Sequence, residues 1–193
     1  MLGLEQIRRA VRCDDPHPPG SELRAAVATI LRATDSDVEI LFIRRAERES
    51  DPWSGHMAFP GGRFEPNDCN LHETAVRETR EEIGLDLAVA GRLLGRIDDV
   101  TTFSHAKPVG LIVTPFVFSV NEAPEFSPNE EVAEVLWAPL GPLARRERDT
   151  TRPYRLRGQE VDLPAFDVDG RVVWGLTYLM ISALFRRLGI VVG

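Results

Sequence analysis

The sequence predicts an α/β domain built in layers, with strands interleaved between two substantial helices. Three observations carry this prediction. A well-capped helical segment lies at 70–84, and an amphipathic helical segment lies at 174–187. The run at 109–120 is continuously apolar, which predicts a strand buried on both faces. At 193 residues the chain is long enough to bury a core of its own.

The N-terminal part predicts a short helix and a linker ahead of the main domain. Apolar residues at helical spacing favour a helix over 1–12. Prolines and a glycine between 14 and 21 are typical of a linker. We therefore divide the chain into residues 1–20, the N-terminal helix and linker, and residues 21–193, a single main domain.

The remaining elements follow along the chain. Apolar and β-branched runs predict strands at 24–33, 38–44, 56–59, a strand pair at 86–97, 109–120, 130–139 and two short strands in 163–173. The run at 130–139 fits strand or helix by pattern, and its branched residues favour strand. Polar or proline-containing segments predict loops at 50–55, 98–108 and 121–129, and an exposed charged excursion at 145–157.

The segment 61–85 organises the chain. Asn70 followed by Glu73 predicts a helix start in which the asparagine side chain caps free N–H groups. Gly84 suits the other end, where helices commonly stop on a left-handed residue. One side of this helix is apolar, and three carboxylates gather on an adjoining arc. These carboxylates belong to Glu78, Glu81 and Glu82.

Three carboxylates this close repel one another, so the sequence predicts something that compensates them. Mg²⁺ or Mn²⁺ would do so, because both prefer oxygen ligands and magnesium also binds substrate phosphates. The pair Gly61 and Gly62 lets backbone approach an ion or a phosphate without a side chain in the way. The alternative is a solvated acidic face that binds no metal. Glycine pair, caps and clustered carboxylates within one short stretch favour the metal site.

These residues carry a resemblance to a known family. The run RETREEIGL, which begins at Arg77, resembles the second half of the Nudix hydrolase signature, with Thr79 in place of an aliphatic residue. The first half departs, since Gly62 lies one residue further from Arg77 and Asp68 stands near the expected glutamate. This longer spacing, with FPGG ahead of it, resembles the coenzyme A pyrophosphatase branch. The resemblance implies a Nudix fold over roughly 21–188, a mixed curved sheet sandwiched between helices.

The resemblance also implies a role for each matched residue. Glu78 and Glu82 would hold the metal ion. Glu81 would either bind a further ion or act as the base that takes a proton from the attacking water, and these two roles stay open. Arg77 would orient a glutamate, which completes a catalytic set of Arg77, Glu78 and Glu81. The residues expected to contact substrate are Arg44, Gly61 and Gly62.

Composition narrows the class of partner. A net charge of -7 argues against a broad nucleic-acid-binding surface. No apolar run approaches the roughly 18 residues that span a bilayer, and the N-terminus lacks the apolar core of a signal peptide. Cys13 and Cys69 have no metal-ligand spacing, which fits a reduced, cytoplasmic setting. We expect a small-molecule nucleoside diphosphate as partner, and a homodimer stays open.

The leading hypothesis is a metal-dependent hydrolase that cleaves the P–O–P linkage of a nucleoside diphosphate derivative, with coenzyme A or acyl-CoA as first candidate. ADP-ribose, a dinucleotide or an oxidised nucleotide is the alternative, because Arg45, Trp53 and His56 depart from the pattern of the coenzyme A branch. A non-catalytic binding module is disfavoured by the presence of all three carboxylates. Further candidates for the site are Glu130 and Glu131, His105, Arg48 and the arginines of 145–157.

Overall fold

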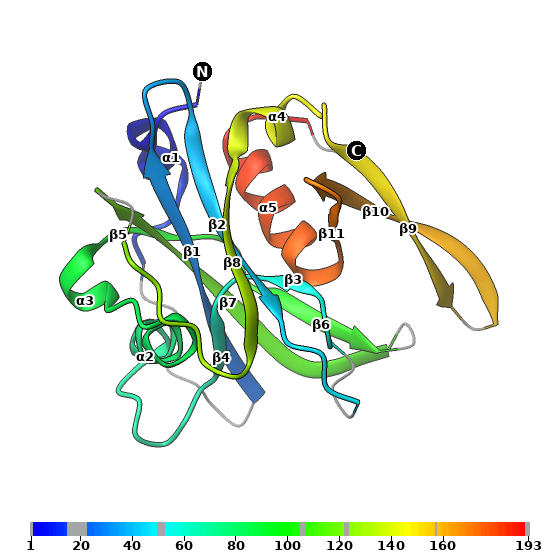
Figure 1. The fold of residues 1–193 in the computed structure, drawn as a ribbon, viewed down its shortest axis with the longest axis horizontal. Helices are drawn as coiled ribbons and strands as arrows, with labels where there is room; N and C mark the ends of the chain where they lie inside the picture. The colour runs from blue at the N-terminus through cyan, green and yellow to red at the C-terminus, as the bar shows by residue number, and fades with distance from the viewer. Residues whose placement is uncertain are drawn as a thin grey trace.

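The computed structural model shows a layered α/β protein with a mixed sheet, as the sequence predicts. The described residues are 2–14, 23–49, 53–104, 107–121, 124–156 and 158–191. An eight-stranded sheet forms the centre, with helices on both faces, and a three-stranded sheet stands beside it (Figure 1). The expected linker at 14–21 lies almost wholly outside the described residues, as does His105.

The helices and strands have the following bounds. The helices are α1 (Leu4–Ala10), α2 (Leu71–Ile83), α3 (Leu87–Ala90), α4 (Leu140–Ala144) and α5 (Gly175–Arg187). The large sheet contains β1 (Leu23–Ala33), β2 (Val38–Arg45), β3 (Met57–Ala58), β4 (Gly61–Arg63), β5 (Gly91–Arg96), β6 (Val100–Ser104), β7 (Lys107–Val120) and β8 (Val132–Pro139). The small sheet contains β9 (Asp149–Leu156), β10 (Gln159–Val168) and β11 (Arg171–Val173).

Strand β7 lies inside the large sheet, and its burial is confirmed for residues 113–120, while residues 110–112 are exposed or half-buried. It pairs in parallel with β1, from Leu23 opposite Leu111 to Arg32 opposite Val120, and antiparallel with β5 and β6. Its alternate side chains enter two separate clusters of buried residues, one on each face of the sheet. The two predicted strands β1 and β2 pair antiparallel, and β2 also pairs antiparallel with β3 and β8.

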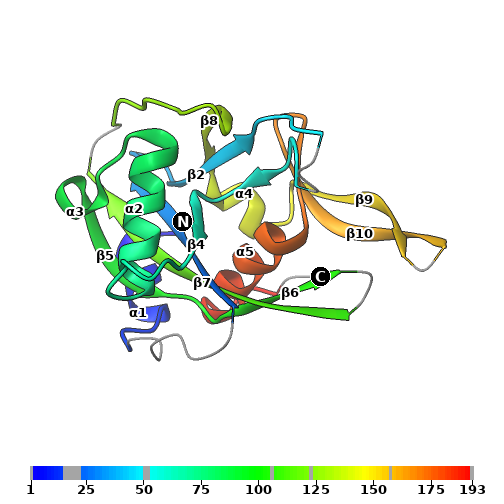
Figure 2. The same cartoon turned by 90° about the horizontal axis from the view of Figure 1, so that it is seen from below.

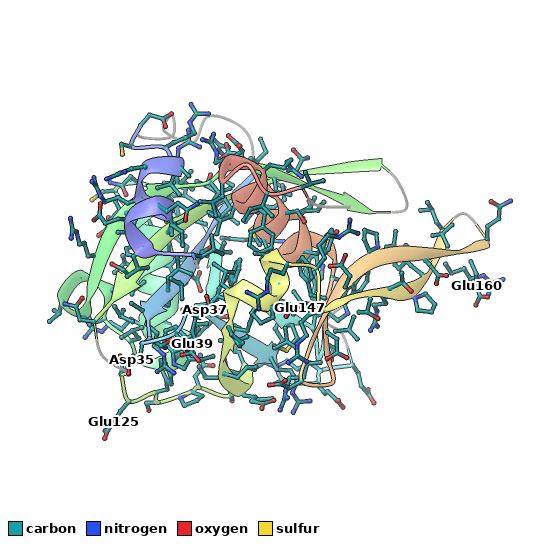
Figure 3. All side chains as sticks on the ribbon, turned by 90° about the horizontal axis from the view of Figure 1, so that it is seen from above. Asp35, Asp37, Glu39, Glu125, Glu147 and Glu160 are labelled. Atoms are coloured by element: carbon teal, nitrogen blue, oxygen red, sulfur yellow. The ribbon has the colours of Figure 1, made fainter. Side chains whose placement is uncertain are left out.

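The small sheet extends away from the rest of the molecule. Strands β9 and β10 form a long antiparallel hairpin that projects beyond the main body (Figure 2), and Glu160 lies near its far tip (Figure 3). The third strand, β11, contacts β3 of the large sheet. The chain enters α5 directly after β11, so the small sheet is attached to the main body at the beginning of that helix.

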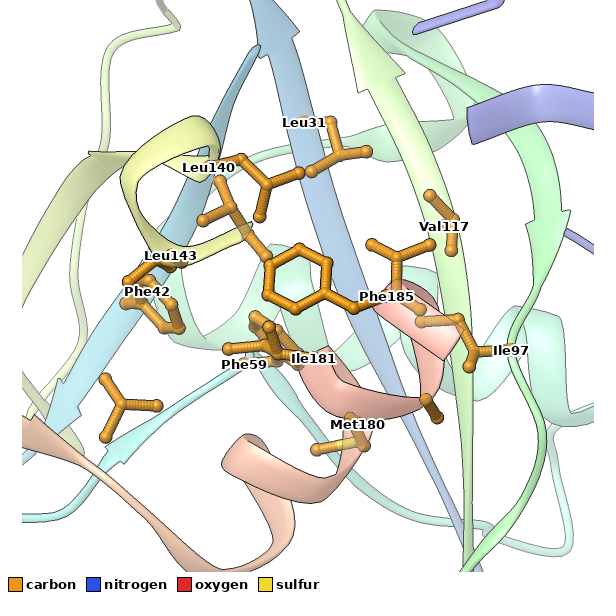
Figure 4. Packing of buried hydrophobic residues seen from close by; sticks show 14 of the residues in the cluster. Leu31, Phe42, Phe59, Ile97, Val117, Leu140, Leu143, Met180, Ile181 and Phe185 are labelled. Atoms are coloured by element: carbon orange, nitrogen blue, oxygen red, sulfur yellow. The ribbon is translucent and has the colours of Figure 1, made fainter. Parts of the chain in front are cut away.

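Each face of the large sheet has its own apolar core. On one face α1 and α5 pack over β1, β2 and β7, and Phe185 of α5 lies fully buried between Leu31, Val117 and Leu140 (Figure 4). On the other face α2 buries Leu71, Ala75 and Ile83 against the sheet. Helix α2 therefore has its own side of the sheet, and the predicted packing of the C-terminal helix is confirmed. In the described residues, no helix is long and apolar enough to cross a bilayer.

Three segments differ from the sequence prediction. The expected strand pair at 86–97 is a single strand, β5, preceded by the short helix α3, because the Asp86 side chain accepts a hydrogen bond from the Ala88 N–H and caps that turn. The expected loop at 98–108 instead contains β6 and the beginning of β7. The expected excursion at 145–157 is mostly strand β9. Its backbone N–H and C=O groups form hydrogen bonds with β10, a partner that the sequence prediction did not identify.

Candidate active site

Helix α2 begins and ends as the sequence predicts. The Asn70 Oδ1 accepts a hydrogen bond of 2.9 Å from the Glu73 N–H, and the Glu73 carboxylate accepts one of 2.6 Å from the Cys69 N–H. This reciprocal pair satisfies N–H groups that the first turn leaves free. At the other end Gly84 has φ of 73°, a left-handed conformation that glycine adopts without steric cost.

Glu82 is the buried carboxylate of the site. Glu82 is only 3% exposed, although the other acidic residues of the same helix reach solvent. The Gly61 N–H donates a 2.8 Å hydrogen bond to Glu82 Oε2. The pKa of Glu82 is raised to about 7, chiefly by burial; the charges of Glu78 and Glu131 act in the same direction, and the Gly61 hydrogen bond and Arg45 act against it. The fold thus holds a carboxylate where its negative charge is poorly solvated.

The glycine pair lies against these carboxylates as strand β4, not as a simple turn. A Cβ atom on Gly62 would lie 2.2 Å from Glu78 Oε1, so only glycine leaves room for that carboxylate. Gly61 has φ of 152°, and a Cβ there would lie 2.3 Å from the carbonyl oxygen of Ala26 on β1. The backbone of β4 is therefore packed closely against both β1, its partner in the sheet, and α2, and Figure 2 shows β4 beside α2.

Arg77 joins the other carboxylates of the helix. Its Nη1 donates to Glu78 Oε1 at 3.0 Å and to Glu81 Oε2 at 3.3 Å, and its Nη2 donates to the Arg63 carbonyl at 3.1 Å. Burial raises the pKa of Glu78, while Arg77 acts in the opposite direction. The Glu81 side chain is 56% exposed, against 17% for Glu78. Of the three acids, Glu81 is the one that solvent reaches most easily.

Asp68 holds Arg77 in place, a role that its sequence position alone did not reveal. Its carboxylate accepts two bonds from Arg77, Nε to Oδ1 at 2.8 Å and Nη2 to Oδ2 at 3.0 Å. The Thr74 hydroxyl and the Glu65 N–H also donate to Oδ2. The hydrogen bonds from Arg77 lower the pKa of Asp68 from 3.8 to about 2, and the same contact raises the pKa of Arg77. A bidentate pair of this kind fixes both side chains.

The family match follows on this geometry. The family model of the NUDIX domain matches residues 22–157. The chain belongs to the Nudix family. Members of this family are hydrolases that act on nucleoside diphosphate derivatives with the help of divalent cations, commonly Mg²⁺ or Mn²⁺. The predicted Nudix-type pyrophosphohydrolase is thus confirmed at the level of the family.

Relatives and solved structures agree with the Nudix assignment. The chain is 33% identical over 140 residues to an uncharacterized Nudix hydrolase, NudL, of Yersinia enterocolitica, covering 71% of this chain and 68% of the relative. It is 38% identical over 114 residues to an uncharacterized protein of Schizosaccharomyces pombe, covering 58% of this chain and 35% of that longer protein. A MutT/nudix family protein from Enterococcus faecalis has the same fold, with a TM-score of 0.57 at 15% identity, covering 91% of this chain and 66% of the other. The predicted Nudix fold is confirmed.

The Nudix carboxylates fit a hard divalent cation by their chemistry. All the groups that could bind a cation are carboxylate oxygens. At the glycine pair Glu82 is buried and Glu78 is half-buried, and the charge of Glu131 is close to Glu82. Within the described ranges, no three His, Cys, Asp or Glu side chains already converge as a finished metal site. The reason is visible in the contacts, because Arg77 takes up Glu78 and Glu81. The roles of these residues stay predictions.

The structure separates the three arginines at and just after the end of β2. Arg44 lies on the same sheet face as Phe42, opposite Met57 in register, and pairs with Glu134 at 3.4 Å. Arg45 lies on the opposite face, where its charge acts on Glu82. Arg48 pairs with Glu131 at 3.2 Å. The predicted substrate contact, Arg44, is therefore separated from the carboxylates by the sheet, while Arg45 shares their side.

The loop before β8 brings a further acid toward the helix. The Asn129 N–H donates to the Glu82 carbonyl at 2.9 Å, and the Asn129 side chain accepts from the Glu131 N–H at 2.8 Å. Glu131 thereby lies near enough for its charge to raise the pKa of Glu82. The side chain of Glu130 is 90% exposed. Of the two acids that the sequence left open, Glu131 is the one that this loop places beside the site.

Proposed function

We propose that this Nudix protein is an Mg²⁺- or Mn²⁺-dependent hydrolase of the diphosphate linkage of coenzyme A or an acyl-CoA. The observation that carries the proposal is the buried Glu82 carboxylate beside Glu78, packed against the Gly61–Gly62 backbone. A buried acid with so little compensation is costly unless a cation shares its site. The choice of coenzyme A rests on the FPGG run and the long spacing to Arg77, both of which resemble that branch.

In this mechanism Glu78 and Glu82 hold the cation, and the glycine backbone leaves room for it. The bound cation supplies charge neutralisation on the phosphates and activation of the attacking water. Glu81 takes the proton of that water, because its side chain is the most exposed of the three. Arg77, itself fixed by Asp68, positions Glu78 and Glu81.

The proposed hydrolysis forms one bond to phosphorus and breaks another. The water oxygen forms a bond to one phosphorus of the diphosphate, and the bond from that phosphorus to the bridging oxygen breaks. The leaving phosphate keeps the electron pair, and the proton of the water passes to Glu81. With coenzyme A, the products are phosphopantetheine and adenosine 3′,5′-bisphosphate. Arg44, on the far face of the sheet from the carboxylates, contacts the substrate away from the scissile bond in this proposal.

The test is a substrate screen with the purified chain. Coenzyme A, an acyl-CoA, ADP-ribose and dinucleotides are incubated with Mg²⁺ or Mn²⁺, and products are separated by chromatography. Glu82→Gln and Glu81→Gln are expected to lower kcat by at least about 100-fold. Glu125→Gln, an exposed acid in the loop before β8, is the matched control and retains full activity. Titration with Mn²⁺ in the absence of substrate is expected to show weaker binding to Glu82→Gln than to the control.

Each outcome decides a separate part of the proposal. Cleavage of coenzyme A that is lost in Glu82→Gln supports it in full. A clear preference for ADP-ribose or a dinucleotide removes coenzyme A and leaves the reaction class. Full activity in Glu82→Gln, or activity that a chelator does not reduce, overturns the assignment of this helix as the metal site.

A further inference from the structure

A second group of side chains lies where the projecting hairpin meets the main body. Trp174 occupies the position just before α5, and three side chains surround its indole ring. His56 lies 4.8 Å away between ring centroids, at 67°, and Tyr154 lies 5.7 Å away at 47°. The guanidinium carbon of Arg152 stands 4.7 Å from the Trp174 centroid. We call His56, Arg152, Tyr154 and Trp174 the Trp174 wall.

Two residues of the Trp174 wall lie on one face of the hairpin. Arg152 and Tyr154 are two residues apart on β9 and therefore point the same way, with Leu163 and Val161 opposite them on β10. All four side chains of the wall are half-buried, so a part of each is accessible. The Nε1 of Trp174 is buried and, in the described part of the chain, has no hydrogen-bond partner. Packing alone leaves that donor unsatisfied.

Arg152 differs from the three arginines that precede the hairpin. Arg145, Arg146 and Arg148 pair with Glu147, Asp149 and Asp169 in that order. Arg152 stacks on Trp174 instead, and no carboxylate of the described residues forms an ion pair with it. Stacking fixes the plane of a guanidinium and leaves its N–H groups at the edge of that plane. Such a fixed, uncompensated guanidinium is suited to an anion, and above all to a phosphate.

The wall is connected to the carboxylate site by one short segment. The Thr177 hydroxyl, in the first turn of α5, donates to the Met57 carbonyl of β3 at 3.0 Å. From His56 the chain passes through β3 to Gly61, whose N–H contacts Glu82. Five residues reach at most about 18 Å even when fully extended. A ligand that lies along this segment would have one end at the glycine pair and the other at the wall.

We propose that the Trp174 wall binds the nucleoside half of a substrate that carries a phosphate monoester on its ribose, in addition to the diphosphate. Arg152 donates to the ribose phosphate, and the base stacks beside Tyr154, because aromatic and guanidinium planes are the usual partners of an unpaired base. This inference rests on the proposed function, since it names which half of a coenzyme A-like substrate is recognised and where.

The test is equilibrium binding, which needs no cleavage. Adenosine 3′,5′-bisphosphate and adenosine 5′-monophosphate are titrated into the wild-type chain, Arg152→Gln and Arg155→Gln. Arg155 is the matched control, because it lies on the opposite face of the same strand and is exposed. The wild type is expected to prefer the bisphosphate by at least about 10-fold, the strength of one charge-assisted contact. Arg152→Gln loses this preference, and Arg155→Gln keeps it.

Two further variants separate recognition from folding. Tyr154→Ala is expected to weaken both nucleotides by about 10-fold or more, since it removes a stacking partner. Arg152→Lys keeps the charge without the planar fork, and it is expected to recover only part of the preference. Thermal unfolding of every variant accompanies the titrations. An unchanged preference in a folded Arg152→Gln, or a wild type that does not prefer the bisphosphate, overturns the inference.

The result is distinguishable from failure of the proposed function. If the bisphosphate preference depends on Arg152 while no diphosphate is cleaved, the proposed function fails and the wall stands as a nucleotide site. If coenzyme A is cleaved and Arg152→Gln treats coenzyme A and its dephosphorylated form as the wild type does, the hydrolase stands and the wall is only packing.

Discussion

Substitution of Asp68 by asparagine tests whether one buried carboxylate fixes Arg77, the arginine proposed to position Glu78 and Glu81. The Asp68 side chain is 3% exposed and accepts four hydrogen bonds, two of them from Arg77. An asparagine keeps the shape but replaces one acceptor oxygen by a donor NH₂ group, so it cannot accept all four. At least one of the donors from Thr74, Glu65 and Arg77 then loses its partner, and a buried donor without a partner is destabilising.

The size of the effect follows from the pKa of Asp68, which Arg77, with the hydrogen bonds from Glu65 and Thr74, lowers from 3.8 to about 2 against the effect of burial. By linkage this corresponds to roughly 2.5 kcal/mol of stability at pH 7. Because the pKa is lower in the folded state, the contribution is complete above about pH 4 and disappears as the pH falls toward 2. At pH 3 about half of it remains. Lowering the pH should therefore reduce the difference in unfolding free energy between the wild type and Asp68→Asn.

The assay is urea denaturation of the wild type and Asp68→Asn at pH 7 and pH 3, with Asp35→Asn, an exposed turn residue, as control. We expect a difference in unfolding free energy of about 2 to 3 kcal/mol at pH 7 and about half that at pH 3. In the activity assay, kcat should fall with little change in KM, because Arg77 no longer holds Glu78 and Glu81. An equal loss of stability at both pH values would refute the electrostatic reasoning.

The remaining predictions concern single residues. Gly62→Ala should weaken Mn²⁺ binding and lower kcat by at least about 100-fold, because its Cβ would lie 2.2 Å from Glu78 Oε1, and titration and product analysis measure both. Asn70→Ala should lower the unfolding free energy by about 1 kcal/mol through loss of the cap, with Asn70→Asp close to wild type in urea denaturation. Gly84→Ala and Gly170→Ala each place an alanine at a positive φ, which lowers the unfolding free energy by roughly 1 to 2 kcal/mol. Only at residue 84 does the new Cβ also meet a neighbouring residue. Denaturation should therefore show the larger loss at residue 84, and equal losses would count against the contact.

The parts of the fold that were predictable from sequence are those fixed by local signals. Asn70 and Gly84 set the ends of α2 through side-chain and backbone chemistry within a few residues of each other. The continuous apolar run of β7 could be assigned to a doubly buried strand for the same reason. Strand β9 could not, because its residues alternate between half-buried and exposed, and its only strong signal is its pairing with β10. Its partner is the next strand along the chain, so the sequence lacked only the regular apolar alternation by which a strand is usually recognised.

The candidate site shows the same division. The helical spacing of Glu78, Glu81 and Glu82 could be read from sequence, since residues three and four apart share a helix face. The difference between them could not. The burial of Glu82 and the exposure of Glu81 depend on where β4 crosses the helix, and β4 is held there by β1. Which arginine faces the carboxylates was equally hidden, because neighbouring residues on a strand point to opposite faces.

The two glycines explain why Glu78 and Glu82 are shielded from solvent while Glu81 is exposed. Gly61 brings its N–H to Glu82, and Gly62 leaves the space that Glu78 fills, so the absence of side chains at these two positions creates room for the carboxylates where the helix packs against β4. A side chain at residue 62 would expel Glu78 toward solvent, where an exposed carboxylate holds a cation weakly because water competes for both. In the proposed metal site, the glycine pair sets how much of the charge of the helix is removed from water, and with it how strongly a cation is attracted.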